Sequence, residues 1–310
     1  MGEFEYIRWI RQSTPAWPRV LVGPGDDCAV IEPPAVVGGK GGPLLVTTDM
    51  LLDGSHFVLA EVGPRRVGRK AMAVNLSDIA AMGGRPLAAF VSVGLPRNNA
   101  NASAAELYLG IRELADAFST PIAGGDTNSW TGELVVSVTL LGEAGFQAPI
   151  LRNGAKPGDW LLVTGTLGGS ILGKHLDFTP RIAEALQLQQ QAPIHAMIDI
   201  SDGLTADAYH ICEESGLGLV LCAEQIPISE AAGRMNDART PLEHAMTDGE
   251  DFELAFAVAP EDGARLVRTQ PIDGIMLAHV GVFVGEKGLF LEQARTRRPI
   301  EPRGYKHPFA

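Results

Sequence analysis

Two α+β domains are the fold class that the sequence predicts, and three observations support it. The chain has 310 residues, more than a single hydrophobic core of ordinary size contains. Strand-like and helix-like segments occur in both halves, without the regular alternation that is typical of one parallel barrel. A polar stretch ends in a strong turn signal at residues 154–158. We therefore expect an N-terminal domain of residues 1–148 and a C-terminal domain of residues 149–310.

The N-terminal half alternates between helical and strand patterns. An amphipathic helix is expected at residues 3–12, and helical spacing of apolar residues predicts another at 65–82. Ser103-Ala-Ala-Glu106 matches a capping box, so a third helix is expected to begin there and to reach Phe118. Short apolar runs rich in β-branched residues predict strands at residues 44–48, 90–95 and 134–141.

The C-terminal half has the same two kinds of segment. Leu204, Ala208 and Ile211 are helically spaced, and Ser215-Gly216 is expected to end that helix. Apolar runs predict strands at residues 160–164, 196–200 and 253–258.

The charge balance limits the partners of the chain. There are 37 acidic and 25 basic residues, for a formal net charge of -12. Nucleic acid is not the expected partner, because phosphate binding needs a basic surface. If this chain binds phosphates, cations must first offset its carboxylates. The composition therefore already points to metal ions.

The cysteines and the apolar runs indicate a cytoplasmic protein. Cys28, Cys212 and Cys222 form no CxxC pair, so neither a disulfide framework nor a zinc site is expected. The first residues lack the pattern of a signal peptide. No apolar run approaches the roughly 18 residues of a membrane span, so no membrane partner is expected.

Five short segments place an aspartate beside Gly, Ser or Thr near the end of an apolar run. They are Gly25-Asp-Asp27, Thr47-Thr-Asp49, Asn75-Leu-Ser-Asp78, Gly124-Gly-Asp-Thr127 and Asp199-Ile-Ser-Asp202-Gly. Carboxylates are the oxygen ligands that Mg²⁺ prefers, and converging carboxylates repel one another unless cations lie among them. Glycines beside them allow the backbone to approach a phosphate closely. The five segments together predict a shared magnesium and phosphate site.

Each segment alone has a simpler explanation. An aspartate before glycine is typical of a turn, and Asp202 is also suited to cap the helix that follows it. Asp78 does not fit this explanation, because it lies inside an otherwise apolar helical pattern, where a buried carboxylate needs a partner.

The order of these and further motifs resembles that of the thiamine-monophosphate kinase family, over nearly the whole chain. The matching motifs are Gly25-Asp-Asp-Cys-Ala-Val-Ile31, Thr47-Thr-Asp-Met50, Gly54-Ser-His-Phe57, the stretch from Lys70 to Gly83, Gly124-Gly-Asp-Thr127, Gly154-Ala-Lys-Pro-Gly-Asp159, Val163-Thr-Gly-Thr166, Ile198-Asp-Ile-Ser-Asp-Gly-Leu204, Asp248-Gly-Glu-Asp-Phe-Glu-Leu254 and Gly304-Tyr-Lys-His-Pro-Phe309. The wider superfamily is that of aminoimidazole ribonucleotide synthetase.

The resemblance implies a fold and an activity. The N-terminal sheets of two subunits are expected to join into a shared barrel in a homodimer, and the C-terminal domain is expected to be an α/β sandwich that completes an active-site cleft. The family transfers the γ-phosphoryl group of ATP directly to thiamine monophosphate with several Mg²⁺ ions, giving thiamine diphosphate. No covalent intermediate and no single general base are expected.

The resemblance also implies roles for individual positions. The expected magnesium ligands are Asp27, Thr47, Thr48, Asp49, Asp78, Asp126, Asp199 and Asp202. The expected ATP contacts are Tyr108, Gly125, Asp126, Arg152 and Ser201, with Arg152 balancing phosphate charge. The expected thiamine contacts are His56, Glu250 and Tyr305, since an aromatic face and a carboxylate suit a cationic thiazolium ring.

Three features depart from the usual motifs. Asp248 replaces a frequent glycine and adds negative charge beside the expected acceptor pocket, while Pro308 interrupts the usual terminal His-Phe. The stretch between Thr166 and Pro180 is compact. Within it, residues 168–175 nearly spell a Walker A loop, but His175 lacks the hydroxyl that such a loop uses to bind Mg²⁺.

Two alternatives stay open. One is another ATP-using member of the superfamily, such as a ligase like aminoimidazole ribonucleotide synthetase. The other is a nucleotide-binding dimer that has lost catalysis. Selenophosphate synthetase would need a reactive cysteine or selenocysteine ahead of Gly25-Asp-Asp27, and the related hydrogenase maturation factor a C-terminal cysteine; neither is found.

Overall fold

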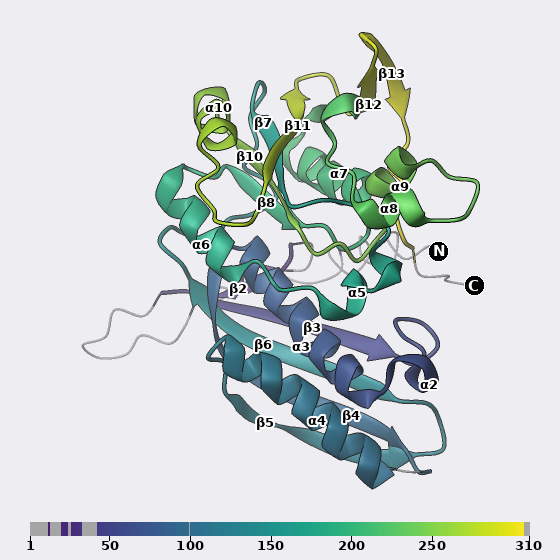
Figure 1. Ribbon diagram of the computed structural model, residues 1–310. Helices are drawn as coiled ribbons and strands as arrows, with labels where there is room; N and C mark the ends of the chain where they lie inside the picture. Colours follow the sequence, from purple (N-terminus) through teal and green to yellow (C-terminus); the bar gives the residue numbers. More distant parts are fainter. Residues whose placement is uncertain (1–11, 13–19, 24–25, 33–41, 99, 307–310) are drawn as a thin grey trace.

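The computed structural model describes residues 20–23, 26–32, 42–98 and 100–306, together with residue 12. These residues form two sheets with helices packed on them, one above the other in Figure 1. This arrangement confirms the predicted α+β class. Apart from residue 12, the helix expected at residues 3–12 lies outside the described residues, as does Pro308.

The first sheet has six strands in the order β1-β2-β3-β6-β4-β5. Only β4 and β5 are parallel neighbours; the other pairs are antiparallel. The strands are β1 (Val20–Val22), β2 (Ala29–Ile31), β3 (Leu44–Leu52), β4 (Gly84–Pro96), β5 (Ile122–Trp130) and β6 (Val135–Ala144). Its helices are α2 (Leu59–Val62), α3 (Pro64–Ala81) and α4 (Ala100–Ala117).

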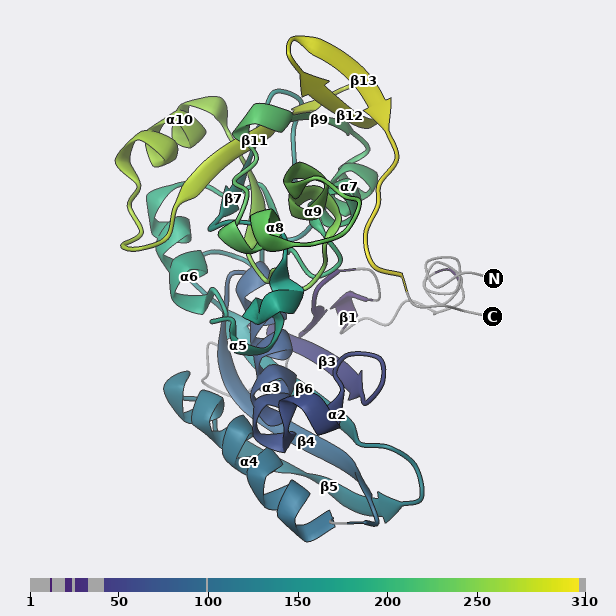
Figure 2. The ribbon, with the colours of Figure 1, turned by 45° about the vertical axis from the view of Figure 1, so that its right-hand side comes forward.

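The two faces of this sheet differ. Helices α3 and α4 lie on one face in both ribbon views (Figures 1 and 2), where Leu45, Val138 and Leu140 are buried beneath α3. Side chains alternate between faces along a strand, so the residues in between point to the other side. There Met50 is 56% and Phe90 is 39% exposed, and no element among the described residues covers this second face, which we call the open face.

Helix α3 is the central element of the molecule. It contacts the first sheet, α4, and also α6 and β8 of the second half. Two glycines allow α3 and α4 to touch: a Cβ at Gly68 would lie 2.1 Å from the carbonyl oxygen of Leu107, and one at Gly110 would lie 1.9 Å from that of Arg65. The close approach leaves α3 buried on almost every side, so its few polar side chains have fixed surroundings.

The second sheet has seven strands in the order β13-β12-β9-β11-β7-β10-β8. They are β7 (Trp160–Thr164), β8 (Ala196–Asp199), β9 (Gly218–Cys222), β10 (Leu254–Val258), β11 (Leu277–Val284), β12 (Gly288–Gln293) and β13 (Thr296–Ile300). The helices are η1 (Ser170–Leu172), α5 (Lys174–Asp177), α6 (Ile182–Gln191), α7 (Leu204–Ser215), η2 (Ala223–Gln225), α8 (Glu230–Arg234), α9 (Pro241–Thr247) and α10 (Pro260–Thr269).

Helices cover both faces of the second sheet. Leu162 of β7 belongs to the core that contains Leu188 of α6 and Leu266 of α10, and this core continues into the first half. The neighbouring Leu161 belongs to a separate core with Ala208 of α7. The predicted C-terminal sandwich therefore has a physical basis in the alternation of apolar residues along β7.

Most expected elements are present, and the following points bear on the site. The helix expected at 103–118 begins at Ala100, so Ser103 lies in its first turn and is not its N-cap; that prediction was wrong. The strand expected at 90–95 runs from Gly84 to Pro96. Strand β5 was not expected, because the exposed edge strand Ile122–Trp130 lacks an apolar alternation. The helix ending at Ser215 with Gly216 in a left-handed conformation was predicted correctly.

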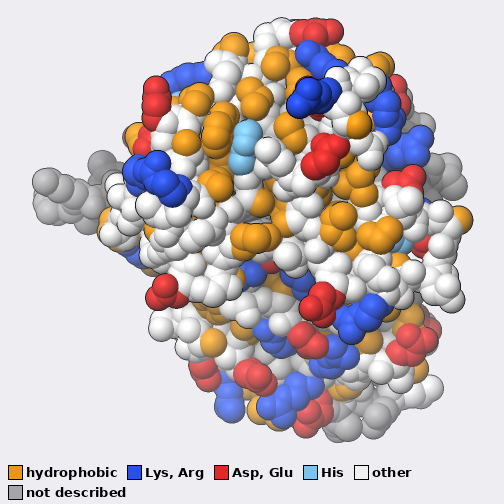
Figure 3. Space-filling model, turned by 45° about the horizontal axis from the view of Figure 1, so that its top comes forward, with side chains coloured by type: hydrophobic (Ala, Val, Ile, Leu, Met, Phe, Trp, Pro, Cys, Tyr) orange, Lys and Arg blue, Asp and Glu red, His pale blue; other side chains and the backbone are white. Residues whose placement is uncertain are grey.

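The surface mixes charges of both signs. On the face shown in Figure 3, Lys and Arg side chains are interspersed with Asp and Glu, and no extended area carries one sign only. No helix of the described ranges has the length and apolar character needed to cross a bilayer.

Candidate active site

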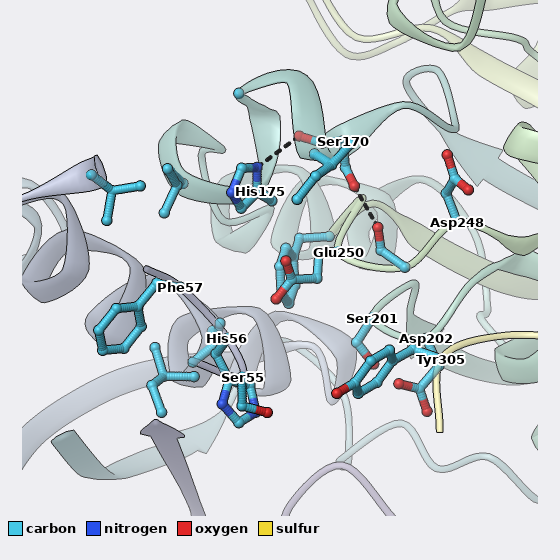
Figure 4. Close-up of a pocket in the computed structure, with 18 of the residues that line it drawn as sticks. Ser55, His56, Phe57, Ser170, His175, Ser201, Asp202, Asp248, Glu250 and Tyr305 are labelled. Atoms are coloured by element: carbon cyan, nitrogen blue, oxygen red, sulfur yellow. Dashed lines mark hydrogen bonds between the residues drawn. The ribbon is translucent and has the colours of Figure 1, made fainter. Parts of the chain in front are cut away.

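A large cavity lies between the two halves of the molecule (Figure 4). Its volume is about 1030 Å³, and it is lined by β3 and the turn after it, by α3, and by loops of the second half. Asp49, Asp78 and Asp199 line it, as do His56, Glu250 and Tyr305. The site therefore depends on both halves of the chain.

Four of the predicted aspartates lie close together at this cavity, in a group that we call the acidic cluster. Oxygens of Asp27, Asp78 and Asp199 lie within 4.8 Å of one another, and Asp49 shares a hydrogen bond with Asp78. Asp27 precedes β2, Asp49 lies on β3, Asp78 on α3 and Asp199 at the end of β8. Segments separated by up to 172 residues of sequence thus place their carboxylates together.

Asp78 is the residue at which the C-terminal part of α3 reaches the cavity. Between Lys70 and Met82, Asp78 is the only residue that is not buried, and it lines the cavity. Thr47 donates a hydrogen bond of 2.5 Å to Asp78, and Ser77 donates one of 2.5 Å to Asp199. The carboxylates are therefore oriented by neighbouring hydroxyls toward the cavity.

The cluster is electrostatically unfavourable by itself. Burial, and then the charge of Asp27, raise the pKa of Asp199 to about 8. Burial, followed by the charges of Asp49 and Asp199, raises the pKa of Asp78 well above its usual value, and burial also raises that of Asp49. Crowded hard oxygen ligands of this kind fit a divalent cation, which relieves their repulsion.

Arg152 balances part of this charge. Its guanidinium donates a forked pair of hydrogen bonds to Asp27, at 3.0 and 2.8 Å, and its backbone N–H donates to Asp26 at 3.2 Å. Burial, and then the charge of Asp27, raise the pKa of Asp26 to about 6. Arg152, predicted to contact ATP, thus lies at the edge of the acidic cluster.

The other predicted ligands differ in their placement. Ser201 and Asp202 follow β8 and line the same cavity. Thr48 is the neighbour of Thr47 on β3, so its side chain points to the open face, where its hydroxyl lies 3.0 Å from that of Thr139. Only its backbone carbonyl is left for the predicted role.

Asp126 is not part of the acidic cluster of its own chain, contrary to the expectation of a single pocket. It lies on β5 opposite Ser92 of β4, and β5 is three strands away from β3, about 14 Å across the sheet. Gly125, Asp126 and Tyr108 instead line a second cavity of about 290 Å³ between α4 and the edge of the sheet. The predicted ATP contacts therefore divide into two groups.

Comparison with known proteins agrees with this geometry. Residues 25–144 match the family model of the AIR synthase related protein N-terminal domain, and residues 156–292 match that of the C-terminal domain. The thiamine-monophosphate kinase of Rhodopirellula baltica is 44% identical over 98% of this chain and 97% of its own length. The chain belongs to the thiamine-monophosphate kinase family.

Other members of the family are similar over the same extent. The thiamine-monophosphate kinase of Aquifex aeolicus is 30% identical over 99% of this chain and 98% of its own length. The solved structure of AaThiL complexed with AMPPCP and TMP has a TM-score of 0.83 and 29% identity, and it covers 99% of this chain and 97% of its own. The recognised resemblance and the two-domain AIR synthase related fold are confirmed.

The residues that the thiamine-monophosphate kinase motifs predict to contact thiamine lie on three sides of the large cavity. His56 comes from the turn after β3, Glu250 from the turn before β10, and Tyr305 from the C-terminal segment (Figure 4). The backbone N–H of Tyr305 donates to the carbonyl of Asp202 at 2.9 Å, which ties this segment to the loop after β8. The structure thus brings together His56, Glu250 and Tyr305 around one cavity.

Two residues beside the site were not predicted. Asp207 of α7 accepts hydrogen bonds from the backbone N–H groups of Asp202 and Gly203, at 3.0 and 2.9 Å, and so shapes the loop after β8. Lys70 of α3 is fully buried. No local signal set Lys70 apart, since Arg65, Arg66 and Arg69 lie on the same helix.

The loop that resembles a Walker A motif has a structural role. Lys174 donates to Glu253 at 2.8 Å and to the carbonyl of Thr166 at 3.0 Å. Ser170 donates to the carbonyl of Gly249 at 2.5 Å. The lysine is thus held by acceptors of its own chain, and the loop is joined to the turn that carries Glu250.

Asp248, which replaces a frequent glycine of the family, also joins these two loops. Its carboxylate accepts from the backbone N–H of Gly169 at 2.8 Å and from Arg239 at 2.7 Å, and it lies 2.9 Å from Nδ1 of His244. Arg239 offsets its charge. The extra negative charge expected beside the acceptor pocket is therefore largely neutralised within the protein.

Proposed function

We propose that this chain transfers the γ-phosphoryl group of ATP to the phosphate of thiamine monophosphate, giving thiamine diphosphate and ADP. The observation that carries the proposal is the convergence of Asp27, Asp78 and Asp199 within 4.8 Å, where Asp78 and Asp199 line the cavity that His56 and Glu250 also line. The names of the relatives support it, as does the AaThiL complex with AMPPCP and TMP.

The proposed reaction is a direct in-line displacement. An oxygen of the acceptor phosphate forms a bond to the γ-phosphorus, the bond from that phosphorus to the β–γ bridging oxygen breaks, and ADP leaves with the electron pair. Positioning and charge stabilisation are the main needs of such a step, so no covalent residue is assigned. The cavity is large enough for the two substrates to approach each other within one enclosure.

Each group of residues has a proposed task. The predicted ligands Asp27, Asp49, Asp78, Asp199 and Asp202, with oxygens of Thr47 and Thr48, would hold Mg²⁺, which when bound neutralises phosphate oxygens. Arg152 and Ser201 would contact the triphosphate from the edge of the acidic cluster. His56, Glu250 and Tyr305 would orient the thiamine portion so that its phosphate points toward the carboxylates.

We further propose that the active form is a homodimer, joined through the open face of the first sheet. Met50, Leu52 and Phe90 are exposed on that face, and an exposed apolar sheet face is typical of an interface. Tyr108, Gly125 and Asp126 line a separate cavity from the one that the acidic cluster of their own chain adjoins. A second copy is proposed to supply these three residues.

We also propose that residues 1–148 and 149–310 are the two domains of the chain, and that the enzyme is cytoplasmic.

One assay tests the proposal against its alternatives. Purified protein with ATP, Mg²⁺ and thiamine monophosphate should produce thiamine diphosphate and ADP in equal amounts, measured by chromatography. ATP turnover only with formylglycinamidine ribonucleotide would instead identify a ligase. Tight ATP binding without turnover of either acceptor would identify an inactive nucleotide-binding dimer.

A further inference from the structure

Lys70 is a buried cation at the junction of the two halves. It is the largest side chain in the described chain that is fully buried, with 0% exposure. Its Nζ donates to Oε1 of Glu250 at 2.6 Å and to the carbonyl oxygen of His56 at 2.8 Å. A charge removed from water is tolerated only when it is paired and hydrogen-bonded, so both contacts are needed for the fold to accept it.

The two partners of Lys70 belong to two walls of the cavity. His56 is on the turn after β3, and Glu250 is 180 residues away from Lys70, on the turn before β10. Glu250 has a φ of 62°, which is a left-handed conformation that residues other than glycine rarely adopt. Its backbone N–H is held by the carbonyl of Ser201 at 2.6 Å, and its side chain by Lys70. The turn is therefore fixed at both its backbone and its carboxylate.

The ion pair between Lys70 and Glu250 changes the charge that the cavity presents to the phosphate acceptor. Glu250 remains 30% exposed at its side chain and lines the cavity, while Lys70 cancels its charge. On the neighbouring turn, Nδ1 of His56 accepts the backbone N–H of Leu52 at 3.0 Å, so in the neutral ring the hydrogen is on Nε2. The walls thus present a charge-balanced carboxylate and an imidazole N–H, which suits a ring that carries its own N–H donor.

We propose that Lys70 is a positioning residue for the phosphate acceptor: it holds the Glu250 carboxylate against the His56 turn so that Glu250 accepts a hydrogen bond from an N–H-bearing ring of the acceptor. This inference rests on the proposed function. The sequence led us to expect an unpaired Glu250 carboxylate facing the cationic thiazolium ring. In the structure, Lys70 is the cation that pairs with Glu250.

A double-mutant cycle tests the inference. The variants Lys70→Met, Glu250→Gln and the two combined are compared with the unmodified chain for kcat and for the KM of each substrate. Lys70→Met should raise the KM for thiamine monophosphate at least about tenfold and leave the KM for ATP within about twofold. Because Lys70 acts through Glu250, the combined variant should be no worse than Glu250→Gln alone.

Two results would overturn the inference. One is an unchanged KM for thiamine monophosphate in Lys70→Met while Glu250→Gln raises it. The other is a combined variant whose KM is the product of the two single effects, since independent residues behave in that way. If Lys70→Met does not fold, the KM for thiamine monophosphate of Glu250→Gln is compared with that of the combined variant. A further rise of about tenfold in this KM on loss of Lys70 contradicts the proposal.

The chain offers a matched control. Arg265 of α10 forms an ion pair of 2.6 Å with Asp262 and lines neither cavity described above. Arg265→Met should leave both KM values unchanged, which separates loss of a cation in general from loss of Lys70. A complete lack of turnover by the unmodified chain would contradict the proposed function itself. Normal turnover with an unaffected Lys70→Met would contradict only the role of Lys70.

Discussion

Replacing Asp78 by asparagine is expected to lower kcat by about a thousandfold or more, because it removes a carboxylate from the centre of the acidic cluster. The fold should persist, since asparagine has the shape of the protonated acid and Thr47 can still donate to its side-chain oxygen. Steady-state kinetics with saturating ATP, Mg²⁺ and thiamine monophosphate measure the effect. A kcat within about tenfold of the unmodified value would contradict the role of Asp78.

The same substitution should change how stability depends on pH. The folded-state pKa values of Asp78 and Asp199 lie above the usual value of 3.8, and that of Asp199 is about 8. Such groups stabilise the fold fully below pH 3.8, and this contribution is lost as the pH rises through the folded-state values. Without metal, the Asp78→Asn variant should therefore lose less free energy of unfolding between pH 5 and pH 8 than the unmodified chain does. Urea unfolding at the two pH values measures this difference.

A surface aspartate provides the control. Asp116 of α4 has a side chain that is 75% exposed and lies outside both cavities. Asp116→Asn should have the kcat and the pH dependence of the unmodified chain. If it lost activity as Asp78→Asn does, the loss would reflect a general effect of net charge.

Mixing two inactive variants is expected to restore activity if the active site is shared between two copies. Asp78→Asn and Asp126→Asn should each be nearly inactive. In a mixed dimer, one site would carry both substitutions and the other would carry none. Random pairing makes half of the dimers mixed, so co-refolded chains should recover about a quarter of the unmodified activity. The measurement is turnover before and after co-refolding in equal amounts.

The matched mixture distinguishes this from a general effect of refolding. Asp78 and Asp199 belong to the acidic cluster of one chain. A mixture of Asp78→Asn with Asp199→Asn should stay inactive, because every site of a mixed dimer then carries one substitution. Recovery in neither mixture would mean that Asp126 is not supplied by a second copy.

The acidic cluster was largely predictable because each of its members has a local signal. Asp78 is a carboxylate in an apolar helical pattern, and the helix expected at 65–82 is found as α3 from Pro64 to Ala81. Asp199 follows an apolar run that forms the buried strand β8. What the sequence could not give is the partner of each carboxylate, since that depends on how the two halves pack.

Two features of the site escaped prediction for a physical reason. Strand β5 is held by pairing with β4 and not by burial of its own side chains, so the sequence of residues 122–130 shows no strand pattern and the distance of Asp126 from the acidic cluster was missed. The contact of Lys70 with Glu250 joins residues 180 positions apart, and no local pattern identifies such a pair.

Nucleotide binding with and without magnesium tests the central claim, that aspartates distant in sequence form one cation-dependent triphosphate site. The acidic cluster should repel a triphosphate unless divalent ions lie between them. Calorimetry with the ATP analogue AMPPCP should therefore show at least about hundredfold tighter binding with Mg²⁺ than with a chelator. Equal affinity under the two conditions would contradict the account.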